Sequence, residues 1–454
     1  MITLTTSELE ALLGVSQAIP AAPIAGLVHR PEQVHGAELY MPMQSQYTSP
    51  QAISAAFSRG ASFAILQEIP ELPSEDLTRC IVVPSYTDVL KKMARHWMAQ
   101  RPLVLVFGDY AATSVQQMLA AALLAHQRGA YAQSSDGFFS DLCQVARDHE
   151  WGVFEIPCAP NACAQSGLSP QLLICTGFSP RPAESEYECT RRAQQVLNSM
   201  RAEFPQAQWL VNLDDEYVKA SVQTGAAQQY SYGTTEMCTY RCAALHSFGL
   251  DGVEATFCSK GEELPFTLKV PGAYQAHNMV AAVAAAQLLY PSVPLATWAS
   301  ELARFSAPHF RLKFIPLKNY RRVYCEIGPA CLKSYASCLE LAQSFSLEGL
   351  RVALLLGEIE ALPELRKKFW SQYAPIVKQI APVGILGAGA QWIEQKASLG
   401  ALGLKMCSEN SSEALAQLAR SLDFDILLIK GPESTFLRQA AHVLLEREGQ
   451  FSVS

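Results

Sequence analysis

The feature that most constrains the fold is an apolar strand followed by a glycine-headed loop and a long apolar helix. Residues 103–107, Leu-Val-Leu-Val-Phe, carry no polar side chain, which predicts a buried strand. Gly108 heads the loop, and an apolar helical stretch runs from Thr113 to Ala125. This order of elements opens α/β domains of the nucleotide-binding type, so we predict such a domain in the middle of the chain.

Prolines at two candidate linkers divide the chain and predict two further α/β domains. Residues 1–97 combine short helical stretches with an apolar strand, and Arg101-Pro102 follows them as a linker. Prolines mark a second boundary near residue 305. We therefore predict domains at 1–97, 98–305 and 306–454, the last a Rossmann-like domain with a parallel sheet flanked by helices. Its expected strands are 323–326, 352–357, 383–386 and 426–429.

Composition favours a globular protein and excludes several classes of partner. The chain has 454 residues, of which 49% are hydrophobic and 17% charged, and its net charge is −7. Basic residues form no block, so we expect no nucleic-acid partner. The N-terminus lacks the features of a signal peptide, and the longest apolar stretch, 279–290, is too short to span a bilayer. We expect a cytoplasmic protein.

The thirteen cysteines are interpreted as small hydrophobic residues. Two close pairs occur, Cys158/Cys163 and Cys238/Cys242, but neither has a second pair or a histidine cluster at zinc spacing. We predict no metal site.

Eight segments carry a resemblance to a known family by their order along the chain. They are 26–40, 108–114, 212–215, 271–278, 310–311, 325–326, 356–360 and 429–431. Together they resemble the Mur ligases, and among them the ligases that add D-alanyl-D-alanine to the UDP-N-acetylmuramoyl-tripeptide. The resemblance implies a three-domain architecture: a UDP-precursor-type domain, an ATPase-type domain and a Rossmann-like domain. It also implies a link to peptidoglycan precursor metabolism.

The resemblance also shows where the ATP site departs from the family. Members use ATP to activate a carboxylate, which requires phosphate to be positioned and its charge neutralised. In the phosphate loop, Ala111 and Ala112 stand where the family has Gly and Lys. Asp109 adds a negative charge close to where phosphates would lie. Losing one such donor typically lowers a rate by about 10²–10³, so we predict a degenerate P-loop. A plain strand-to-helix turn is the competing interpretation of this segment.

The positions that correspond to the family's metal-binding residues also lack suitable side chains. Cys175 stands at the family's magnesium-binding glutamate, and a neutral thiol is a poor ligand for a hard cation. The stretch between Gly177 and Asn212 contains no lysine for a second metal. We interpret the helix from Glu186 to Phe204 as a solvated structural helix. We expect neither ATP nor Mg²⁺ as a cofactor unless the chain is a divergent ligase.

Several positions match the family and are the candidate binding residues. They are Gly108, Thr113, Asn278, Arg311 and Glu326 for a nucleotide. An ordinary hydrogen bond at a domain interface is the competing interpretation of the last three. Glu326 is also expected to accept a ribose hydroxyl or to pair with Arg311.

One further match, Arg30, is the candidate for a UDP-linked substrate. His35, His277 and His309 have no carboxylate at a telling spacing, so no catalytic residue is assigned.

Three hypotheses follow. The first is a Mur-ligase-like protein that is catalytically inactive or strongly impaired and acts as a binding or assembly partner, of another protein or of a second copy. The second is a divergent ATP-dependent amide ligase acting on a UDP-linked or acidic substrate. The third is a UDP-precursor-binding regulator of a true ligase.

Overall fold

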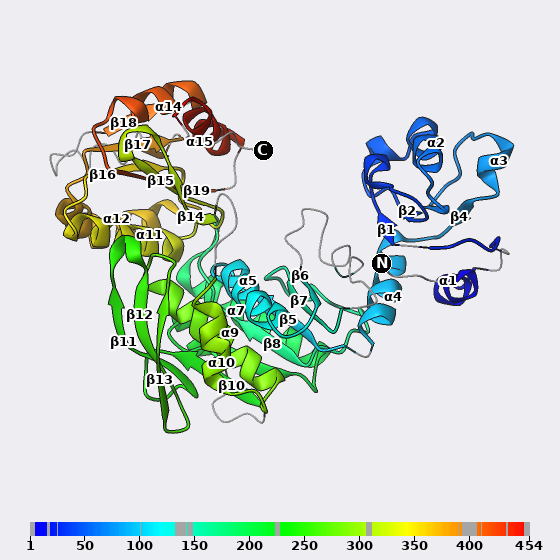
Figure 1. The fold of residues 1–454 in the computed structure, drawn as a ribbon, viewed down its shortest axis with the longest axis horizontal. Coiled ribbons are helices and arrows are strands. Elements are labelled where there is room, and N and C mark those ends of the chain that lie inside the picture. Colours follow the sequence, from blue (N-terminus) through cyan, green and yellow to red (C-terminus); the bar gives the residue numbers. More distant parts are fainter. Residues whose placement is uncertain are drawn as a thin grey trace. The chain divides into compact units, whose positions relative to one another are not determined.

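In the computed structural model, three sheets follow one another along the chain (Figure 1). The structure describes residues 5–15, 19–24, 26–99, 101–131, 142, 149–222, 228–305, 311–389, 391–392, 406–409, 411–432 and 435–448. By internal contacts the chain packs into two compact units. One contains the N-terminal sheet with β6, β7 and most of β5 and β8, and the other contains most of α5 and α7 with everything from Trp209 onward.

The N-terminal sheet is parallel and is buried on both faces. Its strands pair in the order β1 (Leu27–Val28), β2 (Leu39–Tyr40), β3 (Phe63–Leu66) and β4 (Cys80–Val82). Alternate residues of β3 point to opposite faces, as the pleat of a strand requires. Phe63 and Ile65 pack in one core with α1 (Thr6–Leu13) and α4 (Tyr86–Met98), whereas Ala64 and Leu66 pack in another with α2 (Pro50–Ser58). The short helix α3 spans Ser74–Leu77.

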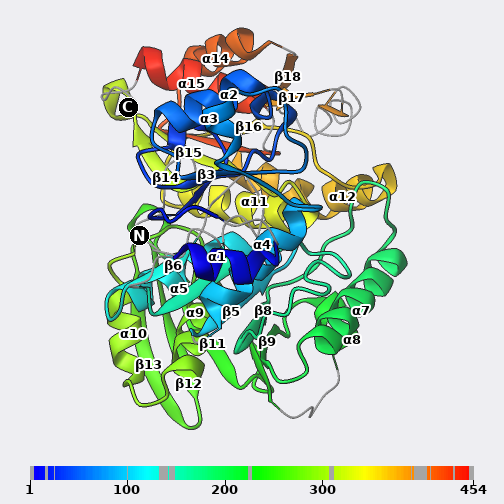
Figure 2. The ribbon, with the colours of Figure 1, turned by 90° about the vertical axis from the view of Figure 1, so that its right-hand side faces the viewer.

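The central sheet has nine strands in the order β13-β12-β11-β10-β9-β8-β5-β7-β6 among the described residues. The strands from β6 to β10 run parallel to their neighbours wherever their pairing is defined, and β11 to β13 form an antiparallel meander. Helices α9 and α10 pack against this meander, as Figure 2 shows. The strands are β5 (Leu103–Phe107), β6 (Gly129–Tyr131), β7 (Trp151–Glu155), β8 (Leu172–Cys175), β9 (Gln208–Asn212), β10 (Gln229–Gly233), β11 (Tyr240–Ser247), β12 (Val253–Ser259) and β13 (Glu262–Leu268). The helices are α5 (Ala112–Leu124), α7 (Glu186–Glu203), α8 (Glu216–Ser221), α9 (Tyr274–Leu289) and α10 (Leu295–Leu302).

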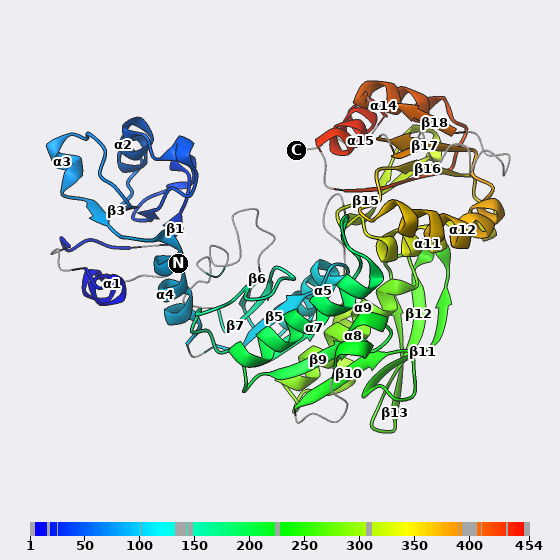
Figure 3. The same cartoon turned by 180° about the vertical axis from the view of Figure 1, so that it is seen from behind.

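The C-terminal sheet has the order β14-β15-β19-β16-β17-β18. It is parallel, as predicted, except that its edge strand β14 is antiparallel to β15. Helices α11 and α12 cover one face and α14 and α15 cover the other (Figure 3). The strands are β14 (Arg311–Pro316), β15 (Arg322–Ile327), β16 (Val352–Leu356), β17 (Gly384–Ala388), β18 (Met406–Glu409) and β19 (Ile426–Gly431). The helices are α11 (Leu332–Leu347), α12 (Pro363–Ile380), α14 (Ser412–Ser421) and α15 (Thr435–Glu448).

The described helices include none that is both long enough and apolar enough to cross a membrane. The predicted strands and helices of all three regions are present. The predicted boundary at 305/306 adjoins residues 306–310, which lie outside the described residues, so the three domain boundaries stay predictions.

Candidate functional site

The order of the central strands creates a crevice at the end of β5. In the sheet, β5 lies between β7 and β8, so the chain leaves β5 toward one edge and later returns on its other side. Ligands of open α/β sheets bind at such a switch point, outside the carboxyl ends of the strands. The Gly108 loop follows β5 and Gly177 follows β8, so both loops border this crevice.

Gly108 is required by packing against the neighbouring strand end. A Cβ atom on Gly108 would lie 2.1 Å from the Thr176 hydroxyl and 2.9 Å from the Gly177 carbonyl oxygen. The next amide, Asp109 N–H, donates to that Gly177 oxygen at 2.9 Å. The loop is therefore held to the end of β8 through its backbone.

Ala111 has the backbone conformation of a glycine. Its φ angle is +61°, in the left-handed region that costs an L-residue roughly 1–2 kcal/mol. This is the position where the resembling family has Gly. The loop thus has a glycine-type backbone conformation at a residue that is not glycine.

Replacing Ala111 with Gly is expected to raise the free energy of unfolding by about 0.5–1 kcal/mol, because relief of the positive φ exceeds the added freedom of the unfolded chain. The matched control is Ala112→Gly at the first residue of α5, where glycine is expected to destabilise by up to about 1 kcal/mol. Urea denaturation measures both. Stabilisation by the control, or destabilisation by Ala111→Gly, contradicts the assignment of strain to Ala111.

The Tyr110 side chain packs against Gly177 at this crevice. Its phenolic oxygen lies so close to Gly177 that a Cβ there would be 2.3 Å away. The hydroxyl donates to Asp215 Oδ2 at 2.7 Å, and the Tyr110 carbonyl accepts a hydrogen bond from Thr176 Oγ1 at 2.6 Å. Burial, together with the Asp215 charge, raises the pKa of Tyr110 well above its usual value, so the phenol stays protonated and donates.

The Asp215 carboxylate is buried at the start of α8. It accepts hydrogen bonds from Val218 N–H at 2.8 Å and from Phe178 N–H at 3.3 Å, besides the Tyr110 hydroxyl. Burial raises the pKa of Asp215 to about 6, although the bonds from Tyr110 and Val218 oppose the rise. The group is therefore mostly ionised at pH 7.

This raised pKa predicts a pH dependence of stability. The folded-state pKa of Asp215 exceeds its ordinary value of 3.8, so between about pH 4 and pH 6 the carboxyl is more protonated in the folded state than in the unfolded state. As pH rises through that window, Asp215 therefore decreases the free energy of unfolding. Above the window this loss of stability is constant. Relative to wild type, Asp215→Asn should gain about 2–3 kcal/mol between pH 4 and pH 7. Urea denaturation at both pH values measures this, and an unchanged difference contradicts it.

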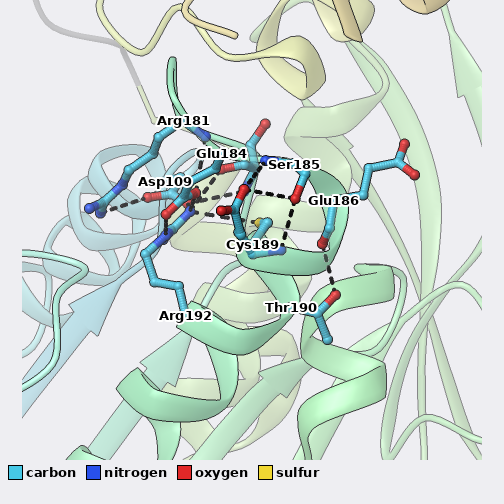
Figure 4. A network of polar contacts seen from close by, with 10 residues as sticks. Asp109, Arg181, Glu184, Ser185, Glu186, Cys189, Thr190 and Arg192 are labelled. Carbon is cyan, nitrogen blue, oxygen red and sulfur yellow. Dashed lines mark hydrogen bonds and ion pairs between the residues drawn. The ribbon is translucent and has the colours of Figure 1, made fainter. Parts of the chain in front are cut away.

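Asp109 does not face the crevice as an unneutralised charge, contrary to our expectation. Its carboxylate pairs with Arg192 at 2.8 Å and with Arg181 at 3.3 Å, and accepts a hydrogen bond from Ser179 N–H at 3.0 Å (Figure 4). Arg192 also pairs with Glu184 at 2.7 Å. The carboxylate turns this way because the guanidinium and amide donors lie there.

The same network corrects our interpretation of helix α7. The Arg192 side chain is only 9% exposed and lies among carboxylates, so α7 carries a buried ion pair rather than being solvated throughout. Spacing along the sequence does not reveal this, since Asp109 and Arg192 are 83 residues apart.

A cleft of about 410 Å³ opens beside the Gly108 loop. Its walls are formed by the carboxyl ends of strands of the central and C-terminal sheets and by the first turns of α5, α9 and α11. Its described lining residues are Tyr110, Ala111, Thr113, Ser114, Asn212, Asp214, Tyr232, Tyr274, His277, Asn278, Glu326, Ile327, Gly328, Pro329, Lys333, Ser334, Ala336, Ser337, Glu340, Tyr373 and Lys430.

The cleft brings together three of the predicted binding residues, Thr113, Asn278 and Glu326. Asn278 is buried and donates to Gln275 Oε1 at 3.0 Å, so its amide already has a partner within the protein. Glu326 pairs with Lys430 at 3.5 Å, a partner that we did not predict.

The other predicted residues lie apart from the lining. Gly108 is behind it, against Thr176. Only the backbone of Arg311 is described, and it pairs with Glu326 across β14 and β15. Arg30 follows β1 in the N-terminal sheet, where its N–H donates to Gln33 Oε1 at 3.1 Å. Cys175 is fully buried at the end of β8.

The histidines differ in their surroundings. His277 lines the cleft, and its Nε2 is buried with no hydrogen-bond partner among the described residues. Burial lowers the pKa of His277, and the Asp214 carboxylate opposes this, a proximity that sequence spacing did not indicate. His35 is exposed, and His309 lies outside the described residues. Within the described chain, no three His, Cys, Asp or Glu residues cluster as metal ligands would.

No family model matches the chain, and no curated protein matches it in sequence. Among solved structures, it is similar to MurF from Acinetobacter baumannii, with 16% identity, a TM-score of 0.76, and coverage of 98% of this chain and 99% of that one. MurF ligase from Thermotoga maritima in complex with ADP shares 14% identity and a TM-score of 0.70 over 92% and 97%. A pseudomurein peptide ligase type C from Methanothermus fervidus shares 12% identity and a TM-score of 0.61 over 90% and 94%. The chain therefore has the three-domain α/β architecture of the Mur ligases, as predicted.

Proposed function

We propose that this Mur-ligase-fold protein has lost ATP-driven amide formation, wholly or nearly so, and acts as a binding or assembly partner. The observation that carries the proposal is the Tyr110 side chain in the switch-point crevice, hydrogen-bonded to Asp215. Phosphates of ligands bound to such domains lie at the amide-rich loop and helix N-terminus that border this crevice.

The cations of the cleft support the same conclusion. Its described cationic lining residues are Lys333 and Lys430, and each pairs with a carboxylate, Glu216 at 2.6 Å and Glu326 at 3.5 Å. Arg192 contacts the loop through Asp109, and its guanidinium already forms ion pairs with Asp109 and Glu184. A triphosphate held for transfer needs positive charge that is not already neutralised. The residues present do not fit ATP, so we propose that neither ATP nor Mg²⁺ is a cofactor.

Calorimetric titration of the full chain with ATP and Mg²⁺, together with a phosphate-release assay, tests the proposal. We expect no binding below millimolar concentration and no phosphate release above the buffer rate. Micromolar, Mg²⁺-dependent binding with turnover in the ordinary enzymatic range of about 1–10³ s⁻¹ would overturn it.

A divergent ligase is the second candidate, because Thr113, Asn278 and Glu326 line one cleft. It would join a UDP-linked or acidic substrate to an amine. Phosphate release that depends on an added acyl acceptor would favour this candidate, whereas no release across a panel of amino acids and dipeptides would exclude it.

A role in binding peptidoglycan precursors is the third candidate. Its support is Arg30, which follows β1 and precedes the 3-10 turn Pro31–Gln33, and the fold similarity to an Acinetobacter baumannii UDP-N-acetylmuramoylalanyl-D-glutamyl-2,6-diaminopimelate–D-alanyl-D-alanyl ligase. A rise in melting temperature with UDP-N-acetylmuramoyl peptides, abolished by Arg30→Ala, would support a regulator of a true ligase. Absence of any shift counts against it.

A further inference from the structure

We infer that Tyr110 and Asp215 form a plug that determines the ligand class of the cleft, admitting neutral or cationic ligands and excluding those with a phosphate chain. The inference rests on the proposed function and extends it, because it assigns to the cleft a ligand of a different charge rather than no ligand. Four features of the structure carry it.

The plug matches the surface on which it rests. Tyr110 packs on the backbone of Gly177, where a side chain of any size would collide with the phenol. A tyrosine in the loop after β5 and a glycine after β8 are thus complementary in shape. The phenol stands at the carboxyl ends of two adjacent strands, where the loop would otherwise present its amides to a ligand.

The plug is held at both ends. The Thr176 hydroxyl binds the Tyr110 carbonyl oxygen, and Asp215 binds the Tyr110 hydroxyl. Asp215 is in turn fixed by the N–H groups of Val218 and Phe178. Moving the ring aside would leave a buried carboxylate without its hydroxyl donor, which is unfavourable.

The plug places negative charge where phosphate would enter. Above pH 6 Asp215 is a carboxylate, so a phosphate group that displaced the phenol would approach an anion in a poorly solvated site. Like charges at short range in such surroundings repel strongly. An uncharged ligand escapes this penalty, and a cationic one gains from it.

The remainder of the cleft is not built for an anion either. Its described lining contains the carboxylates of Asp214, Glu326 and Glu340 against two lysines, both of which are paired. Its volume of about 410 Å³ is within the range of pockets that bind small organic ligands, roughly 300–1,000 Å³. Hydroxyl, amide and carboxylate groups on its walls suit a ligand rich in hydroxyl and amino groups, such as a nucleoside.

A charge series of one compound tests the inference. Adenosine, AMP, ADP and ATP share the base and ribose and differ only in phosphate, so calorimetric titration without Mg²⁺ isolates the effect of charge. For the full-length wild-type chain at pH 7.5 we expect adenosine to bind at least tenfold more tightly than ATP.

Variants of the plug complete the test. In the Tyr110→Asn/Asp215→Asn double variant, which removes both the ring and the charge, we expect the preference for adenosine over ATP to fall at least tenfold. Tyr110→Phe keeps the ring and removes only the hydroxyl that donates to Asp215, so it should lose less of the wild-type preference than the double variant does. Melting curves verify that each variant is folded, and Asp215→Asn alone measures the charge contribution if the double variant is not.

The outcomes separate this inference from the proposed function. ATP binding to wild type as tight as adenosine binding, without turnover, overturns the plug and leaves the loss of ligase chemistry standing. Absence of adenosine binding at millimolar concentration has the same consequence. An unchanged preference in the variants also overturns the plug, whereas Mg²⁺-dependent turnover of ATP overturns both.

Discussion

Replacement of Arg192 with methionine is expected to lower the free energy of unfolding by about 3–5 kcal/mol. The guanidinium contacts two carboxylates, at 2.8 Å for Asp109 and 2.7 Å for Glu184, and its side chain is only 9% exposed. Methionine fills similar space but leaves both carboxylates without their main counter-charge. Chemical denaturation monitored by circular dichroism measures the loss.

Two comparisons decide whether the loss comes from the stranded charges. Arg191→Met, at the exposed neighbouring position of the same helix, should change stability by less than about 0.5 kcal/mol. Adding Asp109→Asn and Glu184→Gln to Arg192→Met should recover at least half of the loss, because an unpaired buried charge is the costly species. If the triple variant is no more stable than Arg192→Met, lost packing is the cause and the electrostatic account is wrong.

Replacement of Lys430 with methionine should lower the free energy of unfolding by about 3 kcal/mol. The Lys430 side chain is fully buried at the end of β19. Its ammonium group lies 3.5 Å from Glu326 and donates to the Pro329 carbonyl oxygen at 2.8 Å. Loss of the ammonium group removes the Lys430 charge that lies beside the largely buried Glu326 carboxylate, and thermal or urea denaturation measures the effect.

Lys333 supplies the matched control, because it lines the same cleft and also pairs with a carboxylate. The exposed fractions of Lys333 and Glu216 are 37% and 56%, and a pair so accessible contributes at most about 1 kcal/mol. Lys333→Met should therefore lower the free energy of unfolding much less than Lys430→Met does. Adding Glu326→Gln should restore part of the stability lost in Lys430→Met and none of that lost in Lys333→Met. Equal losses for the two lysine variants would refute the claim that burial gives the Lys430 pair its larger effect.

Parts of the fold escaped prediction for identifiable reasons. Strands β1 and β2 have two residues each, too few for a periodic pattern to be recognised. The strands of the β11–β13 meander mix exposed polar with buried apolar residues, and Pro265 lies inside β13. A proline within a run argues against a strand unless the strand is at an edge, as β13 is.

Local patterns along the chain were enough to predict the long apolar strands, such as β5 and β19, and the long helices. Continuous apolar runs such as 103–107 and 426–429 can be satisfied only in a sheet covered on both faces, so local pattern was sufficient. The alanines at positions 111 and 112 could also be compared with the resembling family from the sequence alone, because the comparison concerns single positions.

The roles of the charges and of the aromatic ring in the loop after β5 follow from contacts between residues far apart in the sequence. Asp109 meets Arg192 and Tyr110 meets Asp215 across 83 and 105 residues. Ion pairs and buried hydrogen bonds depend on distances of a few ångströms and on exclusion of water, and neither is encoded in spacing along the chain. Asp109 is therefore a neutralised structural group, and Tyr110 is the residue that occupies the crevice.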